Sequence, residues 1–88
     1  MSYSLQIEKQ AAKVIKSLDK QTVKRIHARL KELAQDPFDA RISSLIEMGQ
    51  GERKSRVGNW RIFFEVDEAT STISFIAVRP RSRAYRKI

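Results

Sequence analysis

The chain has 88 residues, with 18 lysines and arginines against 10 aspartates and glutamates, and it contains no cysteine. This length allows one small domain, expected to span residues 1–88, and the lack of cysteine excludes disulfides and thiolate metal sites. The net charge of +8 indicates a polyanionic partner, with nucleic acid ahead of an acidic protein or an anionic membrane surface. No apolar run is long enough to cross a bilayer and no signal peptide is apparent, so we expect a cytoplasmic protein without a membrane partner.

The N-terminal part of the chain predicts a strand followed by two helices. Apolar and polar residues alternate at Tyr3, Leu5 and Ile7, which is typical of a strand. From residue 8 the apolar spacing becomes helical. A first apolar stripe consists of Ala11, Val14, Ile15 and Leu18, and a second consists of Val23, Ile26, Leu30 and Leu33. Asp19 can cap the second helix, and Asp36-Pro37 ends it because a residue before proline disfavours the α region.

The C-terminal part predicts three strands. Residues 38–51 are ambiguous, since Ile42, Leu45 and Met48 suit either a short helical turn or a loop anchored in the core. Strands are expected at 52–57 and 61–67, joined by a tight turn at Gly58-Asn59. Residues 72–78 are nearly all apolar at their end, which predicts a central strand. The order β-α-α-β-β-β indicates an α+β fold, with an N-terminal strand and a two-helix hairpin packed on a mostly antiparallel sheet.

Cations alternate along the predicted hairpin. Lys54 and Arg56 must share a face of their strand, and the hairpin register could bring Arg61 near them. Rigid strands that hold three cations would form a phosphate-binding surface. Two alternatives give these cations no role in function. Lys54 and Arg56 could merely solubilise an exposed strand, and Arg61 could form a surface ion pair with Glu65.

The hairpin also carries a family resemblance. It is similar to the basic-x-Arg-Val-Gly-x-aromatic-Arg hairpin of the RelE/ParE toxin superfamily of bacterial and archaeal toxin–antitoxin systems, on residues Lys54-x-Arg56-Val57-Gly58-Asn59-Trp60-Arg61. The closing Arg81-x-x-x-Tyr85 resembles the end of that family, and looser matches cover most of the chain. Two positions depart from the pattern: Glu52 stands where some RelE members have lysine, and Ile46 stands where a basic residue is often found.

The resemblance implies one of two activities. RelE-like members are ribosome-dependent endoribonucleases that cut messenger RNA in the ribosomal A site, and ParE-like members inhibit DNA gyrase. The fold alone does not choose between them. We expect the RelE-like activity, a metal-independent endoribonuclease with no cofactor, and keep a ParE-like gyrase inhibitor and a non-catalytic RNA- or ribosome-binding module as alternatives.

A metal-free ribonuclease needs a base, a charge to stabilise the phosphorane and a proton for the leaving oxygen. The only histidine, His27, lies on the second predicted helix, so cations are expected to do most of the work. We assign transition-state stabilisation to Arg61 and the base to Lys54, whose charged form the neighbouring arginines disfavour. Phosphate binding is assigned to Arg56, leaving-group support to Arg81, and base stacking or nucleophile orientation to Tyr85.

Further residues are expected to contact the substrate or to modify the site. The substrate-binding candidates are Arg53, Trp60, Arg79 and Arg83. For Trp60 we favour the competing interpretation, packing across to the partner strand, over stacking on a base. Glu52 could replace Lys54 as the base or form a salt bridge with it. The carboxylates do not have the spacing of a metal site.

The toxin interpretation also implies partners. We expect a cognate antitoxin, a small acidic or amphipathic protein that wraps the domain and masks the basic face. The ribosome and messenger RNA would be the targets, and promoter DNA would be bound only through the antitoxin.

Overall fold

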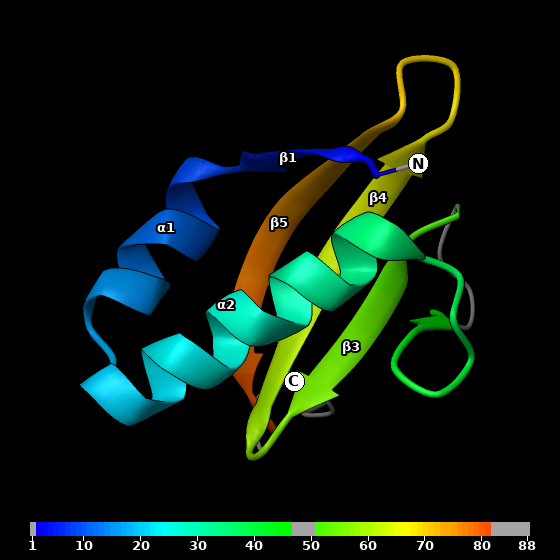
Figure 1. Ribbon diagram of the computed structural model, residues 1–88. Helices are drawn as coiled ribbons and strands as arrows, with labels where there is room; N and C mark the ends of the chain where they lie inside the picture. Colours follow the sequence, from blue (N-terminus) through cyan, green and yellow to red (C-terminus); the bar gives the residue numbers. More distant parts are fainter. Residues whose placement is uncertain (1, 47–50, 82–88) are drawn as a thin grey trace.

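The computed structural model describes residues 2–46 and 51–81, which form five strands and two helices (Figure 1). In chain order these are β1 (Ser4–Ile7), α1 (Lys9–Lys16), α2 (Lys20–Gln35), β2 (Ser44–Leu45), β3 (Arg53–Val57), β4 (Trp60–Asp67) and β5 (Thr72–Pro80). The strands make one sheet in the order β1-β5-β4-β3-β2. β1 is parallel to β5 and every other pair is antiparallel. The α+β prediction is confirmed.

The ambiguous segment 38–51 contributes a strand, which corrects the predicted count of strands. Ser44 lies opposite Lys54 and Leu45 opposite Arg53, so β2 pairs with the start of β3. A two-residue strand is too short to show alternation, which is why the apolar pattern of this segment suggested a helical turn or a loop. Residues 47–50, including the predicted core residue Met48, lie outside the described part of the chain.

The two helices begin and end where local chemistry requires. The Asp19 carboxylate accepts hydrogen bonds from the Thr22 backbone N–H at 3.1 Å and from the Thr22 hydroxyl at 2.6 Å. These bonds cap α2, as predicted, and they lower the pKa of Asp19 because they favour its ionised form. Asp36 has left the helical region (φ −154°), and the buried Pro37 follows it.

Both helices cover one face of the sheet, so the hydrophobic core lies between two layers (Figure 1). Buried side chains alternate along the strands with side chains on the opposite face, which we call the open face. The core comprises Ala11, Ile15, Ile26, Leu30, Leu33, Val57, Ile62, Phe64, Ile73, Phe75 and Val78. The rings of Phe64 and Phe75 lie 5.7 Å apart at a tilt of 46°, an arrangement that aromatic pairs favour.

The register of β3, β4 and β5 determines which side chains share the open face. Gly58 has a φ of 59° at the first turn position, where type II′ hairpins place glycine. A bulge between Phe63 and Phe64 leaves Ile76 as an extra residue of β5. Because of this extra residue, core residues of β5 lie opposite core residues of β4 on both sides of the bulge: Phe75 opposite Phe64, and Val78 opposite Ile62.

Candidate functional site

Three arginines form a row across the open face. Arg56 of β3 lies directly opposite Arg61 of β4, and Arg61 lies directly opposite Arg79 of β5. Directly opposed residues of antiparallel strands project from the same face, with Cβ atoms about 5 Å apart. Lys54 is two residues before Arg56 and therefore joins the same face, opposite Phe63. The sheet thus brings four of the predicted cations together at its hairpin end.

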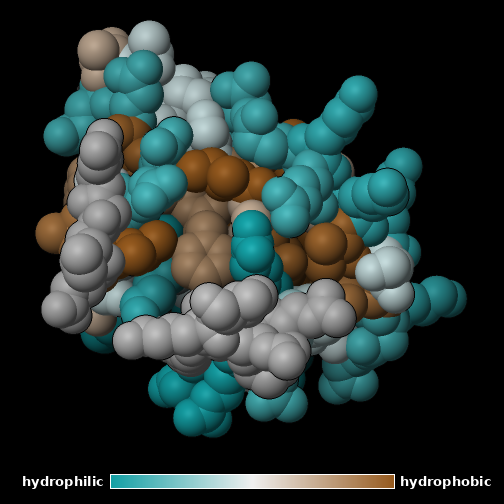
Figure 2. Space-filling model, turned by 180° about the vertical axis from the view of Figure 1, so that it is seen from behind, coloured by the Kyte–Doolittle hydropathy of each residue, from teal (hydrophilic) through white to brown (hydrophobic). Residues whose placement is uncertain are grey.

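The open face has opposite charges at its two ends. Beyond Phe63 the same face of β4 carries Glu65 and Asp67, which with Glu68 line a hollow at the far end of the sheet. Viewed from behind, this side of the molecule shows apolar side chains in its middle and hydrophilic ones around them (Figure 2). An anion that approaches this face is therefore directed to the arginine end.

Arg61 differs from its neighbours because it is buried, with 3% of its surface exposed, whereas Arg56 and Arg79 are exposed. One of its Nη atoms lies 3.5 Å from the Trp60 carbonyl oxygen. Burial restricts a guanidinium to few orientations, and it strengthens the interaction with any anion that reaches it, since less water screens the charge. Arg61 is therefore the most fixed charge of the row.

The sequence suggested two ion pairs that would occupy the cations of the site, Arg61 with Glu65 and Lys54 with Glu52. Within residues 2–46 and 51–81, the ion pairs join Arg29 to Glu32 and Arg41 to Asp39. The pairs of Arg61 with Glu65 and of Lys54 with Glu52 are not among these, and Arg61 and Lys54 each have other interactions. The hydrogen bond from Arg41 lowers the pKa of Asp39 and raises that of Arg41, because each charge stabilises the other.

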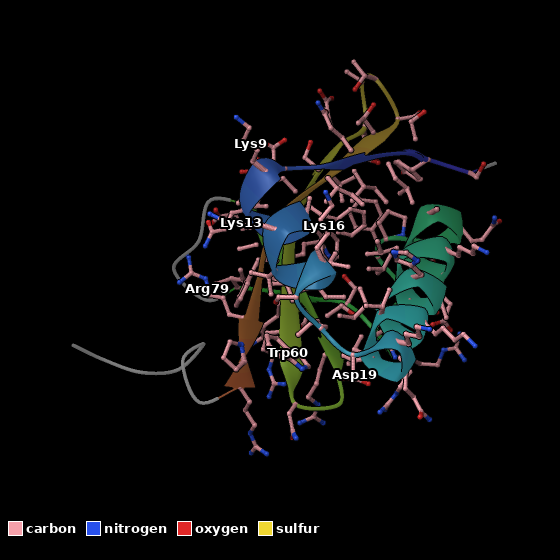
Figure 3. The ribbon with its side chains drawn as sticks, turned by 90° about the vertical axis from the view of Figure 1, so that its left-hand side faces the viewer. Lys9, Lys13, Lys16, Asp19, Trp60 and Arg79 are labelled. Carbon is pink, nitrogen blue, oxygen red and sulfur yellow. The ribbon has the colours of Figure 1, made fainter. Side chains whose placement is uncertain are left out.

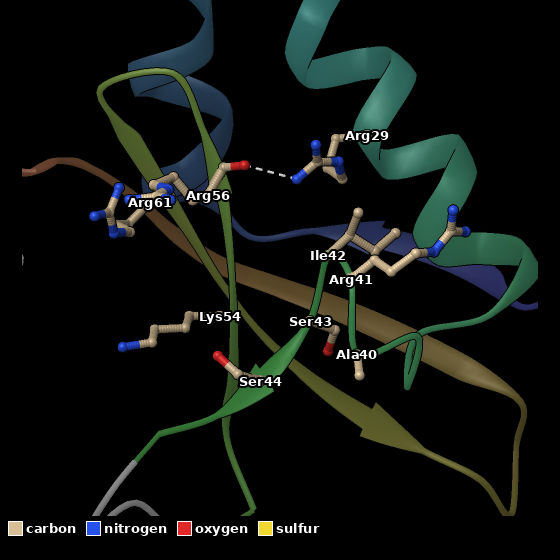
Figure 4. Close-up of a pocket in the computed structure, with 9 residues that line it drawn as sticks. All are labelled: Arg29, Ala40, Arg41, Ile42, Ser43, Ser44, Lys54, Arg56 and Arg61. Atoms are coloured by element: carbon tan, nitrogen blue, oxygen red, sulfur yellow. Dashed lines mark hydrogen bonds between the residues drawn. The ribbon is translucent and has the colours of Figure 1, made fainter.

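A hollow of about 440 Å³ opens beside the arginine row (Figure 4). The residues that line it are Arg29, Ala40, Arg41, Ile42, Ser43, Ser44, Lys54, Arg56 and Arg61. Five of these nine are cationic and none of them is a carboxylate. A surface with this lining attracts phosphate, and the Ser43 and Ser44 hydroxyls add neutral polar groups at its edge.

Arg29 of α2 is a part of this site that the sequence did not reveal. Its Nη1 donates to the Arg56 carbonyl oxygen at 2.6 Å and to the Ser55 hydroxyl at 2.9 Å, and its Nε donates to Glu32 at 3.1 Å. β2 pairs with β3 only at Arg53 and Lys54, so within residues 2–46 and 51–81 no strand pairs with the rest of that edge of β3. Arg29 covers this edge and anchors the strand that carries Arg56 (Figure 4).

Two predicted substrate residues and the alternative base lie away from the arginine row. Arg53 faces the helix side of the sheet, where its Nε donates to the Ser43 hydroxyl at 2.7 Å and its guanidinium lies 5.1 Å from the Phe38 ring. Trp60 packs against the hydrophobic core. Glu52 precedes β3, and its carbonyl oxygen accepts from the Ile46 N–H at 2.9 Å.

The remaining predicted residues belong to the end of the chain. The Arg81 N–H donates to the Asn59 carbonyl oxygen at 2.7 Å, so this exposed residue lies beside the hairpin turn. Arg83 and Tyr85 lie outside the described residues. In the described part of the chain, no group of three or more His, Cys, Asp or Glu side chains could hold a metal ion. Nor does either helix there have the length and apolar character needed to cross a membrane.

The sequence matches a family model described as "ParE toxin of type II toxin-antitoxin system, parDE" over residues 2–85. The chain belongs to the RelE/ParE toxin superfamily. The resemblance carried by the hairpin is thereby confirmed, and the protein is a toxin of a type II toxin–antitoxin system. No curated protein sequence matches this toxin significantly.

Solved structures show the same fold and are mostly RelE toxins. The archaeal RelE of the RelE–RelB complex from Pyrococcus horikoshii OT3 is 26% identical to this toxin, with a TM-score of 0.82 over 94% of this chain and 99% of that one. RelE of the RelB–RelE complex from Methanococcus jannaschii is also 26% identical, with a TM-score of 0.73 over 91% and 94% of the two chains. The toxin in the intact RelBE complex of E. coli is 16% identical, with a TM-score of 0.79 over 90% and 96%.

Proposed function

We propose that this toxin is a metal-independent endoribonuclease that cleaves messenger RNA in the ribosomal A site and thereby inhibits translation. The observation that carries the proposal is the row of Arg56, Arg61 and Arg79 with Lys54 beside it, at the mouth of a cationic hollow. The likeness to RelE structures adds to this, and the buried guanidinium of Arg61 is suited to a charge that develops during the reaction.

The reaction needs only groups of the RNA and of the protein. The ribose 2′-oxygen attacks the adjacent phosphorus and the bond to the 5′-oxygen breaks, which leaves a 2′,3′-cyclic phosphate and a 5′-hydroxyl. Lys54, in its neutral form, takes the proton from the 2′-hydroxyl. Arg61 stabilises the additional negative charge of the phosphorane, and Arg56 holds the phosphate. The 5′-oxygen takes a proton from solvent water as it leaves, and we assign support of this leaving group to Arg81.

We expect the activity to depend on the ribosome because the lysine and arginines of the site are weak proton-transfer groups. The open face offers no histidine, because His27 lies exposed on α2, on the other side of the sheet. Lysine and arginine are poor proton-transfer groups at neutral pH, so most of the rate must come from the position of the substrate. A ribosome that holds the messenger in a near-attack geometry would supply that position.

The proposed partner is a cognate antitoxin in the cytoplasm. Three of the similar structures are complexes of RelE with RelB, which supports an antitoxin for this toxin. We expect a small acidic or amphipathic chain that masks the cationic hollow, and binding to promoter DNA only through that chain.

The test is induction of the toxin followed by mapping of messenger RNA ends on translating ribosomes. Wild type should produce new ends within codons at the A site. Arg56→Gln and Arg79→Gln, which alter exposed members of the row, should weaken cleavage while the fold persists, and Lys31→Gln on the far side of α2 should not. Uncut messenger RNA under wild-type induction would refute the proposal.

A second candidate function is gyrase inhibition without chemistry, favoured by the match to a ParE family model. It predicts blocked DNA supercoiling and intact messenger RNA, so a supercoiling assay run beside the mapping separates the two activities.

A further inference from the structure

Helix α1 presents a second cationic surface, distinct from the arginine row. Lys9, Lys13 and Lys16 are spaced at i, i+4 and i+7, which places them on one side of the helix. All three are exposed, while Ala11 and Ile15 on the other side are buried in the core. Figure 3 shows the three lysines on the helix nearest the viewer. Together with Gln10 and Ala12 they line a shallow hollow of about 680 Å³.

No ion pair between described residues involves the lysines of this face, and the nearest carboxylates in the sequence, Glu8 and Asp19, lie beyond the two ends of α1. The ion pairs between described residues involve Arg29 and Arg41, and no carboxylate occurs within α1 or among the residues that line the hollow. Like charges at i and i+4 destabilise an isolated helix. The protein therefore carries a repulsive arrangement that an anionic partner would relieve.

The position of α1 connects the lysine face to the arginine row. β1 pairs with β5 only as far as Phe75, and the Glu8 N–H donates to the Phe75 carbonyl oxygen at 2.9 Å. From there α1 packs against β5 and runs beside it (Figure 1), while β5 continues toward Arg79 and Pro80. The lysine face thus flanks the strand that carries the last arginine of the row, and Figure 3 shows both from the same side.

We propose that Lys9, Lys13 and Lys16 bind the phosphate backbone of RNA at a site separate from the cationic hollow. Seven residues of helix rise about 10 Å, which corresponds to roughly three phosphates of a stacked strand at about 3.4 Å each. Lysine ammonium groups act as point charges, so this face would recognise phosphates and not base sequence. Since the site binds RNA without cleaving it, the inference does not depend on the nuclease activity.

RNA fits this surface better than an acidic protein does. Protein interfaces depend on apolar or aromatic anchors that fill pockets, and the lining here offers only Ala12 and the aliphatic parts of lysine side chains. A polyanion needs no such anchor, because release of its counterions supplies the binding free energy. The phosphates could belong to a flanking part of the messenger or to ribosomal RNA, which have the same chemistry.

The test compares two triple variants of equal charge. One is Lys9→Gln, Lys13→Gln and Lys16→Gln; the control is Lys20→Gln, Lys24→Gln and Lys31→Gln, three exposed lysines on α2. Glutamine keeps helix propensity, and circular dichroism checks that both variants are folded. The probes are a labelled single-stranded oligoribonucleotide and vacant ribosomes without messenger, so that the two sources of phosphate are distinguished.

We expect the α1 variant to bind at least one probe about tenfold more weakly at low salt than wild type. Its slope of log affinity against log salt should be smaller by about 2, at about 0.7 per lost phosphate contact. The α2 variant should match wild type. Equal effects of the two variants would overturn the proposal, as would an α1 variant that keeps RNA affinity and loses only the antitoxin. Messenger RNA cleavage by wild type and by the Arg56→Gln variant is measured in a separate assay. A failure of the nuclease proposal would appear there and would leave the RNA affinities of the lysine variants unaffected.

Discussion

The arginine row and the lysine face carry the same sign of charge but hold it in different ways. Strand register places Arg61 between Arg56 and Arg79, and its guanidinium is buried. The three lysines of α1 are exposed on flexible side chains without a partner among the described residues. Fixed, partly desolvated charges suit a reaction centre, whereas mobile, hydrated charges suit affinity. One small basic domain can therefore separate chemistry from binding.

Loss of Arg61 is the strongest way to break this comparison. Arg61→Ala should lower the cleavage rate on ribosomes by about 100-fold or more, since removal of one preorganised charge from a transition state costs that much. Arg61→Lys keeps the charge but loses the planar fork, and should recover only part of the rate. Single-turnover cleavage with saturating ribosomes measures this, with circular dichroism as the check on folding. Full activity of the alanine variant would remove Arg61 from the mechanism.

Loss of Arg29 tests whether a helix holds the site in place. Arg29→Ala should destabilise the fold by about 2 kcal/mol, because the Arg56 carbonyl and the buried Ser55 hydroxyl lose a charged donor. Cleavage should fall as well, through displacement of β3, while RNA affinity of the lysine face is unchanged. Urea unfolding monitored by fluorescence gives the stability, and Lys31→Gln serves as the exposed α2 control. An unchanged midpoint would show that the edge of β3 needs no anchor.

The hairpin turn tests the register that aligns the row. Gly58→Ala should cost about 1 kcal/mol, since its φ of 59° is unfavourable for a residue with a Cβ atom. A Cβ atom there would meet Arg25 Nη1 at 3.5 Å, an ordinary contact, so strain in the backbone is the main effect. Gly58→Asn, which tolerates this region better, should recover part of the loss. Thermal unfolding compares the two variants, and equal melting temperatures would rule out backbone strain as the cause.

Asp19 caps α2 outside the arginine row and provides the smallest effect. Its pKa is lowered in the folded state, so its contribution to stability is present above the unfolded pKa and is lost as pH falls through the folded pKa. Wild type should therefore lose slightly more stability in acid than Asp19→Ala, which lacks the cap at every pH. Melting temperatures from neutral to acidic pH measure the difference. If the melting temperatures of the two proteins fell in parallel with pH, the stability supplied by the cap would not depend on the ionisation of Asp19.

The placement of Arg53 was available in the sequence and was missed. Arg53 precedes Lys54, and Trp60 precedes Arg61, so strand alternation alone puts each on the opposite face from its neighbour. The assignment of Arg53 to the substrate followed its charge instead, whereas packing was already the favoured interpretation of Trp60. The structure places both on the helix side, where Arg53 contacts Phe38 and Ser43 and Trp60 packs against the core.

The sequence by itself determined the local features of this toxin: the periods of the helices and strands, the Asp19 cap, the Gly58-Asn59 turn and the shared face of Lys54 and Arg56. These depend on residues within a few positions of one another. Only the tertiary structure decided the short β2 pairing, the burial of Arg61, the opposition of Arg61 to Arg79 and the contact of Arg29 with Arg56. Each of these joins residues distant in the chain, and packing rather than local propensity brings them together.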